Sequence, residues 1–302
     1  MLTEKIAITW AGAAARDLLT LNREAVVIGI ISRGVFLRFP SGWVIFISSE
    51  ILRGPLTLNC PSFPGASLGL QPGDAAEVIG GAVHFQRSGL VLGWDGASTW
   101  QAPELPSGWL TNSERKSRLV ELTRRVLSDP PPGGLSFLLP GLLDLPLITL
   151  SVGDSEHLQI QLHRIHQILT EPSFGCEARL AETLASFTGW GVGLTPSGDD
   201  LTLGFLLAVN RWGERLFPRL KIDELNQEFL VRVDSHTTSL SVSLIRCAAA
   251  GQADERLISA LDGFMTGTED ISAVERTLRS WGNSSGIDAL VGMATAILAC
   301  IG

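Results

Sequence analysis

Hydrophobic and polar positions follow two different patterns along the chain. In the first third, short apolar segments rich in β-branched and aromatic residues are separated by polar turn sequences such as Ser32-Arg33-Gly34 and Pro40-Ser41-Gly42. This alternation is typical of β-hairpins. We therefore predict strands at residues 25–31, 35–39, 43–48, 83–86 and 90–94, with a long proline-rich loop at residues 54–73.

Further along the chain, apolar residues recur every three or four positions, which indicates amphipathic helices. The segment Thr111-Asn112-Ser113-Glu114 has the form of a helix start, and Pro130-Pro131-Pro132-Gly133-Gly134 stops that helix. Further helices are predicted at residues 158–169, 178–187, 198–212, 236–250, 253–265 and 270–281, and a last one from Ser284.

Strands first and helices later predict an α+β fold. Residues 102–108 contain two prolines and form the candidate linker. We expect an antiparallel β-rich barrel or sandwich at residues 1–108 and a mainly helical domain at residues 109–302.

Composition excludes several classes of protein. The 302 residues are 45% hydrophobic and 18% charged, with a net charge of −8 and a mean hydropathy of +0.26. Disorder is therefore excluded, and so is a nucleic-acid partner, which would need a clustered basic surface. The apolar segment at residues 135–150 is interrupted by Pro140, Asp144 and Pro146, so no membrane helix is expected. Four scattered cysteines and the lack of a signal peptide indicate a cytoplasmic protein.

The first candidate segment for chemistry is the glycine-rich sequence at residues 189–200, just before an apolar helix. Glycines at alternate positions allow a backbone to approach a ligand, and we expect Ser197 to cap the helix, whose N-terminus favours an anion. The acidic pair Asp199-Asp200 would suit Mg²⁺ or a ligand N–H group. The alternative, given about equal weight, is an ordinary helix start without a ligand. No Lys-Ser/Thr follows the glycines, so the segment is not a P-loop.

Two further segments combine hydroxyl groups with a charged residue. In the first, Ser239, Ser243 and Arg246 share one helix face, where a guanidinium beside hydroxyls suits a planar oxyanion. The alternative is tight packing, with Arg246 paired to a structural acid. In the second, Ser284-Ser285-Gly286-Ile287-Asp288 opens the last helix, where a serine cap and a first-turn aspartate are the ordinary interpretation.

Two further groups of residues give weaker evidence for a functional site. His157, His163 and His166 lie on one predicted helix, but no further ligand supports a zinc site. A Ser/His/Asp triad through His236 is disfavoured because no G-x-S-x-G nucleophile motif is present.

Together the three segments resemble a known bacterial family. The motifs are G-x-G-L-T-P-S-G-D-D at residues 191–200, T-T-x-x-S-x-S-x-x-R-x-A-A-x-G at 237–251 and S-S-G-x-D-x-L-x-G at 284–292. They look like the family of the AllH-type subunit of oxamate carbamoyltransferase, over about residues 176–302. Two positions differ from the family pattern, with Val192 in place of proline and Asn283 in place of histidine.

The resemblance implies a subunit for carbamoyl transfer between oxalurate and phosphate, working with other protein subunits on a small anionic substrate. Under that reading, backbone N–H groups near Gly191, Gly193, Ser197 and Gly198 would hold the oxyanion, and Arg246 would neutralise it. The hydroxyl groups that would orient the ligand belong to Thr195, Thr238, Ser239 and Ser285. The carboxylates that would accept the carbamoyl N–H, or bind Mg²⁺, belong to Asp199, Asp200 and Asp288.

Two other functions remain open from the sequence. One is a non-catalytic metabolite-binding or scaffold subunit of a complex, and the other is a phosphotransferase with Mg²⁺ at Asp199 and Asp200. The missing lysine in the glycine loop disfavours the phosphotransferase. The apolar composition makes a homo-oligomer plausible.

Overall fold

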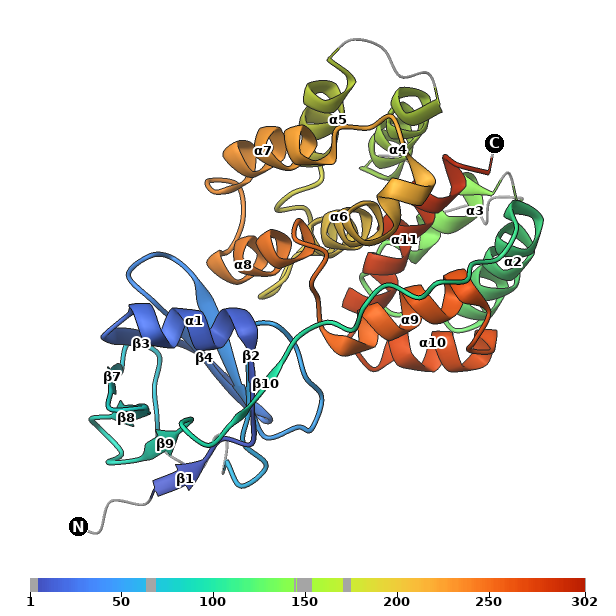
Figure 1. Cartoon of the computed structure of the whole chain (residues 1–302). Helices are drawn as coiled ribbons and strands as arrows, with labels where there is room; N and C mark the ends of the chain where they lie inside the picture. The colour runs from blue at the N-terminus through green and yellow to red at the C-terminus, as the bar shows by residue number, and fades with distance from the viewer. Residues whose placement is uncertain (1–4, 64–68, 144, 146–153, 171–174, 302) are drawn as a thin grey trace. The chain divides into compact units, whose positions relative to one another are not determined.

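The computed structural model describes residues 5–63, 69–143, 145, 154–170 and 175–301 (Figure 1). The chain divides into two compact units, Met1–Pro103 and Glu104–Gly302, where the sequence predicted a boundary after residue 108. No helix in the described part of the chain is long and apolar enough to span a bilayer.

The N-terminal unit is built on one curled ten-stranded sheet with the order β1-β9-β8-β7-β3-β4-β5-β6-β2-β10. Its alternating buried residues, such as Val35 and Leu37 on β4 and Ile45 and Ile47 on β5, form the core of this unit. The strands are β1 (Lys5–Ala7), β2 (Trp10–Gly12), β3 (Glu24–Ile31), β4 (Gly34–Arg38), β5 (Val44–Ser48), β6 (Thr57–Asn59), β7 (Ala75–Ile79), β8 (Ala82–Phe85), β9 (Val91–Gly93) and β10 (Ser98–Trp100).

The predicted β-rich unit is confirmed, and the five predicted strands correspond to β3, β4, β5, β8 and β9. The pairing is mixed, because β1–β9, β2–β10 and β5–β6 are parallel and the other pairs are antiparallel. Strand β6 lies inside the segment predicted as a loop. A strand of three residues is too short to show an alternation pattern. Such strands form because they pair with segments that are distant in the sequence.

A helix that the sequence analysis missed, α1 (Ala13–Leu21), follows β2 directly. It buries Ala15, Leu18 and Leu19 and contacts β2 and β10. No side chain caps its first turn, so the usual sequence signal for a helix start is lacking.

The C-terminal unit is mainly helical, as predicted. Helix α2 begins at the predicted helix start with a capping box, in which Thr111 and Glu114 bond reciprocally. Helix α7 was not predicted. The helices are α2 (Asn112–Ser128), the 3₁₀ turn η2 (Ser136–Leu138), α3 (Leu139–Leu142), α4 (Asp154–Thr170), α5 (Cys176–Ala185), α6 (Ser197–Leu216), α7 (Ile222–Val233), α8 (Ser239–Ala248), α9 (Glu255–Thr266), α10 (Ile271–Arg279) and α11 (Ser285–Leu298).

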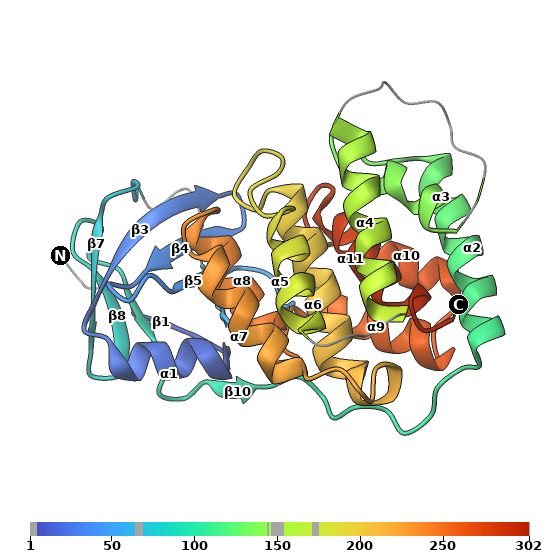
Figure 2. The ribbon, with the colours of Figure 1, turned by 90° about the horizontal axis from the view of Figure 1, so that it is seen from above.

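Helices α6 and α11 form the centre of this unit and pack against each other (Figures 1 and 2). Two glycines allow the close approach: a Cβ atom added to Gly204 would lie 2.0 Å from the Ala289 carbonyl oxygen, and one on Gly292 would lie 1.8 Å from that of Leu201. Backbone-to-backbone packing at these glycines brings the first turns of the two helices together.

Candidate functional site

The glycine loop lies over the start of α6 in a conformation that needs glycine. Gly189, Gly191 and Gly193 all have positive φ, which residues with a Cβ atom adopt rarely. A Cβ atom on Gly191 would lie 2.8 Å from the Ser197 backbone nitrogen, so only glycine fits there. Next to Gly193 there is open space, and Val192 is 92% exposed. The tip of the loop is therefore exposed.

Asp199 anchors this loop. Its Oδ1 accepts the backbone N–H of Gly189 at 2.8 Å, and its Oδ2 accepts the Thr237 hydroxyl. The side chain is 2% exposed. Both oxygens are thus engaged, and Asp199 ties the glycine loop to the segment that precedes α8.

Thr238 makes a second tie between the same two segments. Its hydroxyl donates to the Leu194 carbonyl at 2.7 Å and accepts the Ser241 backbone N–H, which caps α8. The first and second predicted motifs therefore contact each other through two separate side chains. One cap residue serves both the helix and the loop.

Asp200, the next residue along, is in a different situation. It is 1% exposed, and within the described structure neither carboxylate oxygen has a hydrogen-bond partner. Desolvation by burial raises its pKa well above the ordinary value, and the charges of Asp288 and Asp199 raise it further. The Ser285 and Thr195 hydroxyls lie close enough to oppose this shift, although neither forms a hydrogen bond of normal geometry with it. These surroundings favour the neutral form of the carboxyl group over the ionised form.

The Thr195 and Ser285 hydroxyls lie 3.3 Å apart and join the first and third motifs. Both residues are half-buried, between the exposed glycine loop and the buried Asp200. All three predicted motifs meet in this region.

Asp288, on the first turn of α11, is also fully buried. Its Oδ1 accepts the Leu135 backbone N–H at 2.6 Å, while its Oδ2 has no partner among the residues that the structure describes. Burial raises its pKa, and the bonds from Leu135, Ser284 and Ser197 oppose the shift. Two neighbouring buried carboxyl groups with raised pKa values are typical of functional sites.

The sequence analysis did not identify residues 134–135, which contact the Asp288 carboxyl group, as part of this site. A Cβ atom on Gly134 would lie 2.7 Å from Asp288 Oδ1, so a larger residue would push the carboxyl group away. Gly134 was interpreted as part of a helix stop. No local sequence signal at Gly134 indicates a contact with a residue so far along the chain.

The expected role of Ser197 as a helix cap is wrong. Helix α6 begins at Ser197 itself, and Pro196 occupies the cap position without a side-chain hydrogen bond. Ser197 instead lies buried beside Asp288. Gly198 packs against the Phe187 carbonyl oxygen, 1.9 Å from a Cβ atom added there.

Arg246 and Ser239 lie on α8. One guanidinium nitrogen of Arg246 donates to both carboxylate oxygens of Asp234 at 2.8 Å. Ser239 is half-buried, and its carbonyl oxygen accepts the Ser243 hydroxyl. The structure therefore joins Arg246 to a carboxylate at the end of α7, a residue that was not among the predicted ones.

The described residues contain no group of three or more His, Cys, Asp or Glu side chains placed to hold a metal ion. With both Asp199 oxygens engaged, the carboxylate oxygens open to a cation are those of Asp200 and Oδ2 of Asp288.

Residues 187–297 match the family model of the oxamate carbamoyltransferase subunit AllH. The matched segment includes the glycine loop and the first turns of α6, α8 and α11, and it confirms the resemblance of the three motifs. It relates the chain to a carbamoyltransferase subunit. No curated protein and no solved structure gives a significant match to the chain.

Proposed function

We propose that the chain is a carbamoyltransferase-type subunit that binds a small, amide-bearing anion where the first turns of α6 and α11 meet. The observation that carries this proposal is the Asp200 carboxyl group, buried with both oxygens unpartnered among the described residues. Buried polar groups in folded proteins are nearly always hydrogen-bonded, so two open oxygens at a junction of three motifs favour a ligand there.

A neutral carboxyl group is complementary to a carbamoyl group. Its O–H donates to the carbamoyl oxygen, and its carbonyl oxygen accepts a carbamoyl N–H, which gives two parallel hydrogen bonds. An ionised carboxylate could make only the second of these bonds. The raised pKa of Asp200 therefore favours a ligand of the type of carbamoyl phosphate, oxalurate or oxamate over one with only anionic groups.

The anionic part of such a ligand would be held by backbone N–H groups. Residues 191–193, which are exposed at the loop tip, would supply them, and the N-termini of α6 and α11 would add favourable dipoles. Thr195 and Ser285 would orient the ligand between these groups and Asp200. Arg246 would neutralise the anion after exchanging Asp234 for it.

In carbamoyl transfer, stabilisation of the developing oxyanion is the largest contribution expected of the protein. The same backbone N–H groups would supply it. The family description names a subunit, which supports a requirement for partner proteins in the complete reaction. The chain's own share would be recognition of the carbamoyl-bearing substrate.

A magnesium site is the competing use of the same oxygens. Asp200 and Asp288 have open carboxylate oxygens, and hard cations prefer oxygen ligands. Mg²⁺ would require both groups to be ionised, whereas amide recognition uses the neutral form of Asp200. The ligand-binding test described next also distinguishes the phosphotransferase alternative from the scaffold alternative.

The test is thermal unfolding of the full chain with carbamoyl phosphate, oxamate, phosphate or ATP, each with and without Mg²⁺. A ligand at 100 times its dissociation constant stabilises the folded state by about 2.7 kcal/mol, which is a readily measured shift in Tm. We expect a shift with carbamoyl phosphate and oxamate that does not need Mg²⁺. A shift only with ATP and Mg²⁺ would favour the phosphotransferase, and the lack of any shift would contradict binding by this chain.

A further inference from the structure

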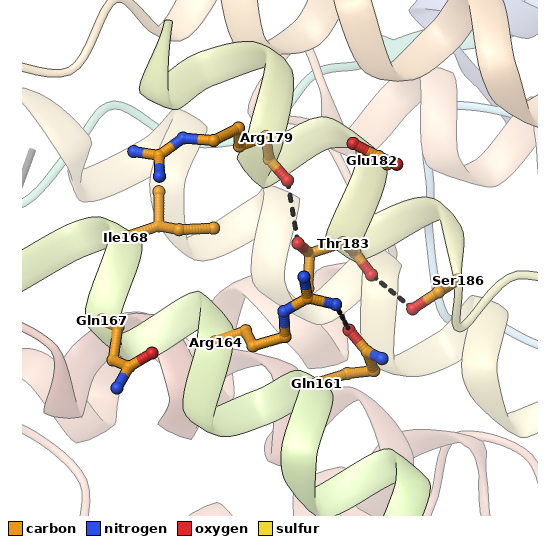
Figure 3. A pocket seen from close by; sticks show the side chains of 8 residues that line it. All are labelled: Gln161, Arg164, Gln167, Ile168, Arg179, Glu182, Thr183 and Ser186. Carbon is orange, nitrogen blue, oxygen red and sulfur yellow. Dashed lines mark hydrogen bonds between the residues drawn. The ribbon is translucent and has the colours of Figure 1, made fainter. Parts of the chain in front are cut away.

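A separate pocket lies between α4 and α5, with a volume of about 600 Å³ (Figure 3). It precedes the segment that matches the family model. Its residues come from one face of each helix, at helical spacing. Those lining it are Gln161, Arg164, Gln167, Ile168, Arg179, Glu182, Thr183 and Ser186.

The charge of this pocket contrasts with that of the chain. Among the described lining residues, Arg164 on α4 and Arg179 on α5 contribute two guanidinium groups and Glu182 one carboxylate, whereas the whole chain has a net charge of −8. Guanidinium groups bind phosphate and carboxylate oxygens through two parallel N–H donors. A cationic pocket on an acidic protein favours an anionic ligand.

The wall between the two arginines is polar and held in place. Thr183 donates its hydroxyl hydrogen to the Arg179 carbonyl at 2.8 Å, and Ser186 donates to the Thr183 carbonyl at 2.7 Å (Figure 3). With both hydrogens used internally, these hydroxyl oxygens are acceptors for a ligand O–H or N–H. Gln161 is buried, and its Oε1 lies 3.4 Å from Arg164 Nη1, so it steadies that guanidinium.

Size and composition narrow the ligand class. A volume of about 600 Å³ lies in the middle of the range for small-molecule pockets and is far larger than one phosphate group requires. Of the eight lining residues, Ile168 is the one apolar side chain, and none is aromatic. The described residues of this pocket therefore offer no stacking partner to a base or other flat ring, and they favour a polar ligand.

We propose that the pocket between α4 and α5 is a second ligand site, which binds a small organic dianion that also carries hydroxyl or amide groups. One phosphate or carboxylate group would bind Arg164 and the other Arg179. The hydroxyl or amide groups would bond to Glu182, Thr183 and Ser186. This site is independent of the proposed carbamoyl site and uses none of its residues.

The test is isothermal titration calorimetry of the full chain with pyrophosphate and with citrate. We expect one saturable site for at least one of these probes. Arg164→Gln and Arg179→Gln should each weaken binding about tenfold or more, because each removes a charge-assisted hydrogen-bond donor pair. Arg164→Lys keeps the positive charge but loses the planar pair of N–H donors. Its affinity for the probe should therefore lie between those of wild type and Arg164→Gln.

Two matched variants locate the binding. Arg124→Gln, at an exposed position on α2, removes the same charge elsewhere and should leave the affinity unchanged. Asp200→Asn should also leave it unchanged, whatever the outcome for the carbamoyl site. The proposal is overturned if neither probe binds saturably at millimolar concentration. An equal loss of affinity in Arg124→Gln, or a loss in Asp200→Asn, would overturn it as well.

Discussion

Replacing Asp200 by asparagine should stabilise the folded chain at neutral pH. The wild-type carboxyl group is 1% exposed, has no hydrogen-bond partner among the described residues, and lies near the charges of Asp288 and Asp199. Its pKa is raised well above the ordinary value of 3.8, mainly by desolvation. Ionising this carboxyl group therefore costs more free energy in the folded state than in the unfolded state.

The sign of the pH dependence follows from this shift. Between pH 3.8 and the raised pKa, the folded state binds more protons than the unfolded state, so the free energy of unfolding falls as pH rises. The loss is about 1.4 kcal/mol for each unit by which the pKa is raised, and it is complete above the raised pKa. Below the ordinary pKa this group contributes no cost. Asparagine has the same shape and no charge, so the variant lacks this slope.

The assay is urea unfolding followed by far-UV circular dichroism, from about pH 4 to about pH 8. We expect Asp200→Asn to be more stable than wild type at the upper end, with the difference shrinking toward the lower end. Asp199→Asn is the matched control, since it replaces one of two engaged acceptor oxygens by an N–H donor and should destabilise by about 1–3 kcal/mol. An Asp200→Asn chain that is less stable than wild type at every pH, with the same slope, would refute this reasoning.

Three further outcomes follow from the packing. Gly292→Ala should destabilise by about 1–3 kcal/mol or more in urea unfolding, because the added Cβ would lie 1.8 Å from the Leu201 carbonyl oxygen; unchanged stability would contradict the close helix contact. Thr111→Ala breaks the capping box of α2 and should cost about 1 kcal/mol in the same assay. Ser113→Ala, two residues further along and outside the box, should cost less. Cys247 is buried with its pKa raised to about 12 by desolvation, so a thiol reagent should label it only after unfolding; rapid labelling of the native chain, mapped by mass spectrometry, would contradict its burial.

Local sequence signals were sufficient for much of the fold. The capping box at Thr111 and Glu114 fixes the start of α2 because all its partners lie within four residues. Helix α7 also carries such a signal, since Leu225, Phe229 and Val233 are buried at helical spacing. It was missed because Lys221 provides no side-chain cap. The three-residue strands β2 and β10 had no readable signal, since each depends on pairing with a distant segment.

The surroundings of the two aspartates in the candidate site could not be predicted from the sequence. Asp199 and Asp200 are neighbours in the chain and were predicted to act together. The structure gives one of them two hydrogen-bond donors, Gly189 and Thr237, and gives the other a buried position near Asp288. Helical geometry turns adjacent residues about 100° apart, so adjacent side chains meet different neighbours. Those neighbours come from segments far along the chain, and no local pattern specifies them.

The most direct test of the proposed function compares oxamate with pyruvate, which differ only in that oxamate has an NH₂ group, which makes its carbonyl an amide, where pyruvate has a methyl group. Their affinities would be measured by calorimetry for wild type, Asp200→Asn and Asp200→Leu. If a neutral Asp200 recognises the amide, wild type should prefer oxamate by about tenfold to a hundredfold. Asparagine can also donate and accept one bond each, so Asp200→Asn should retain the preference, and Asp200→Leu should lose it. Equal affinities for the two ligands in wild type, or a preference lost in Asp200→Asn, would contradict the account.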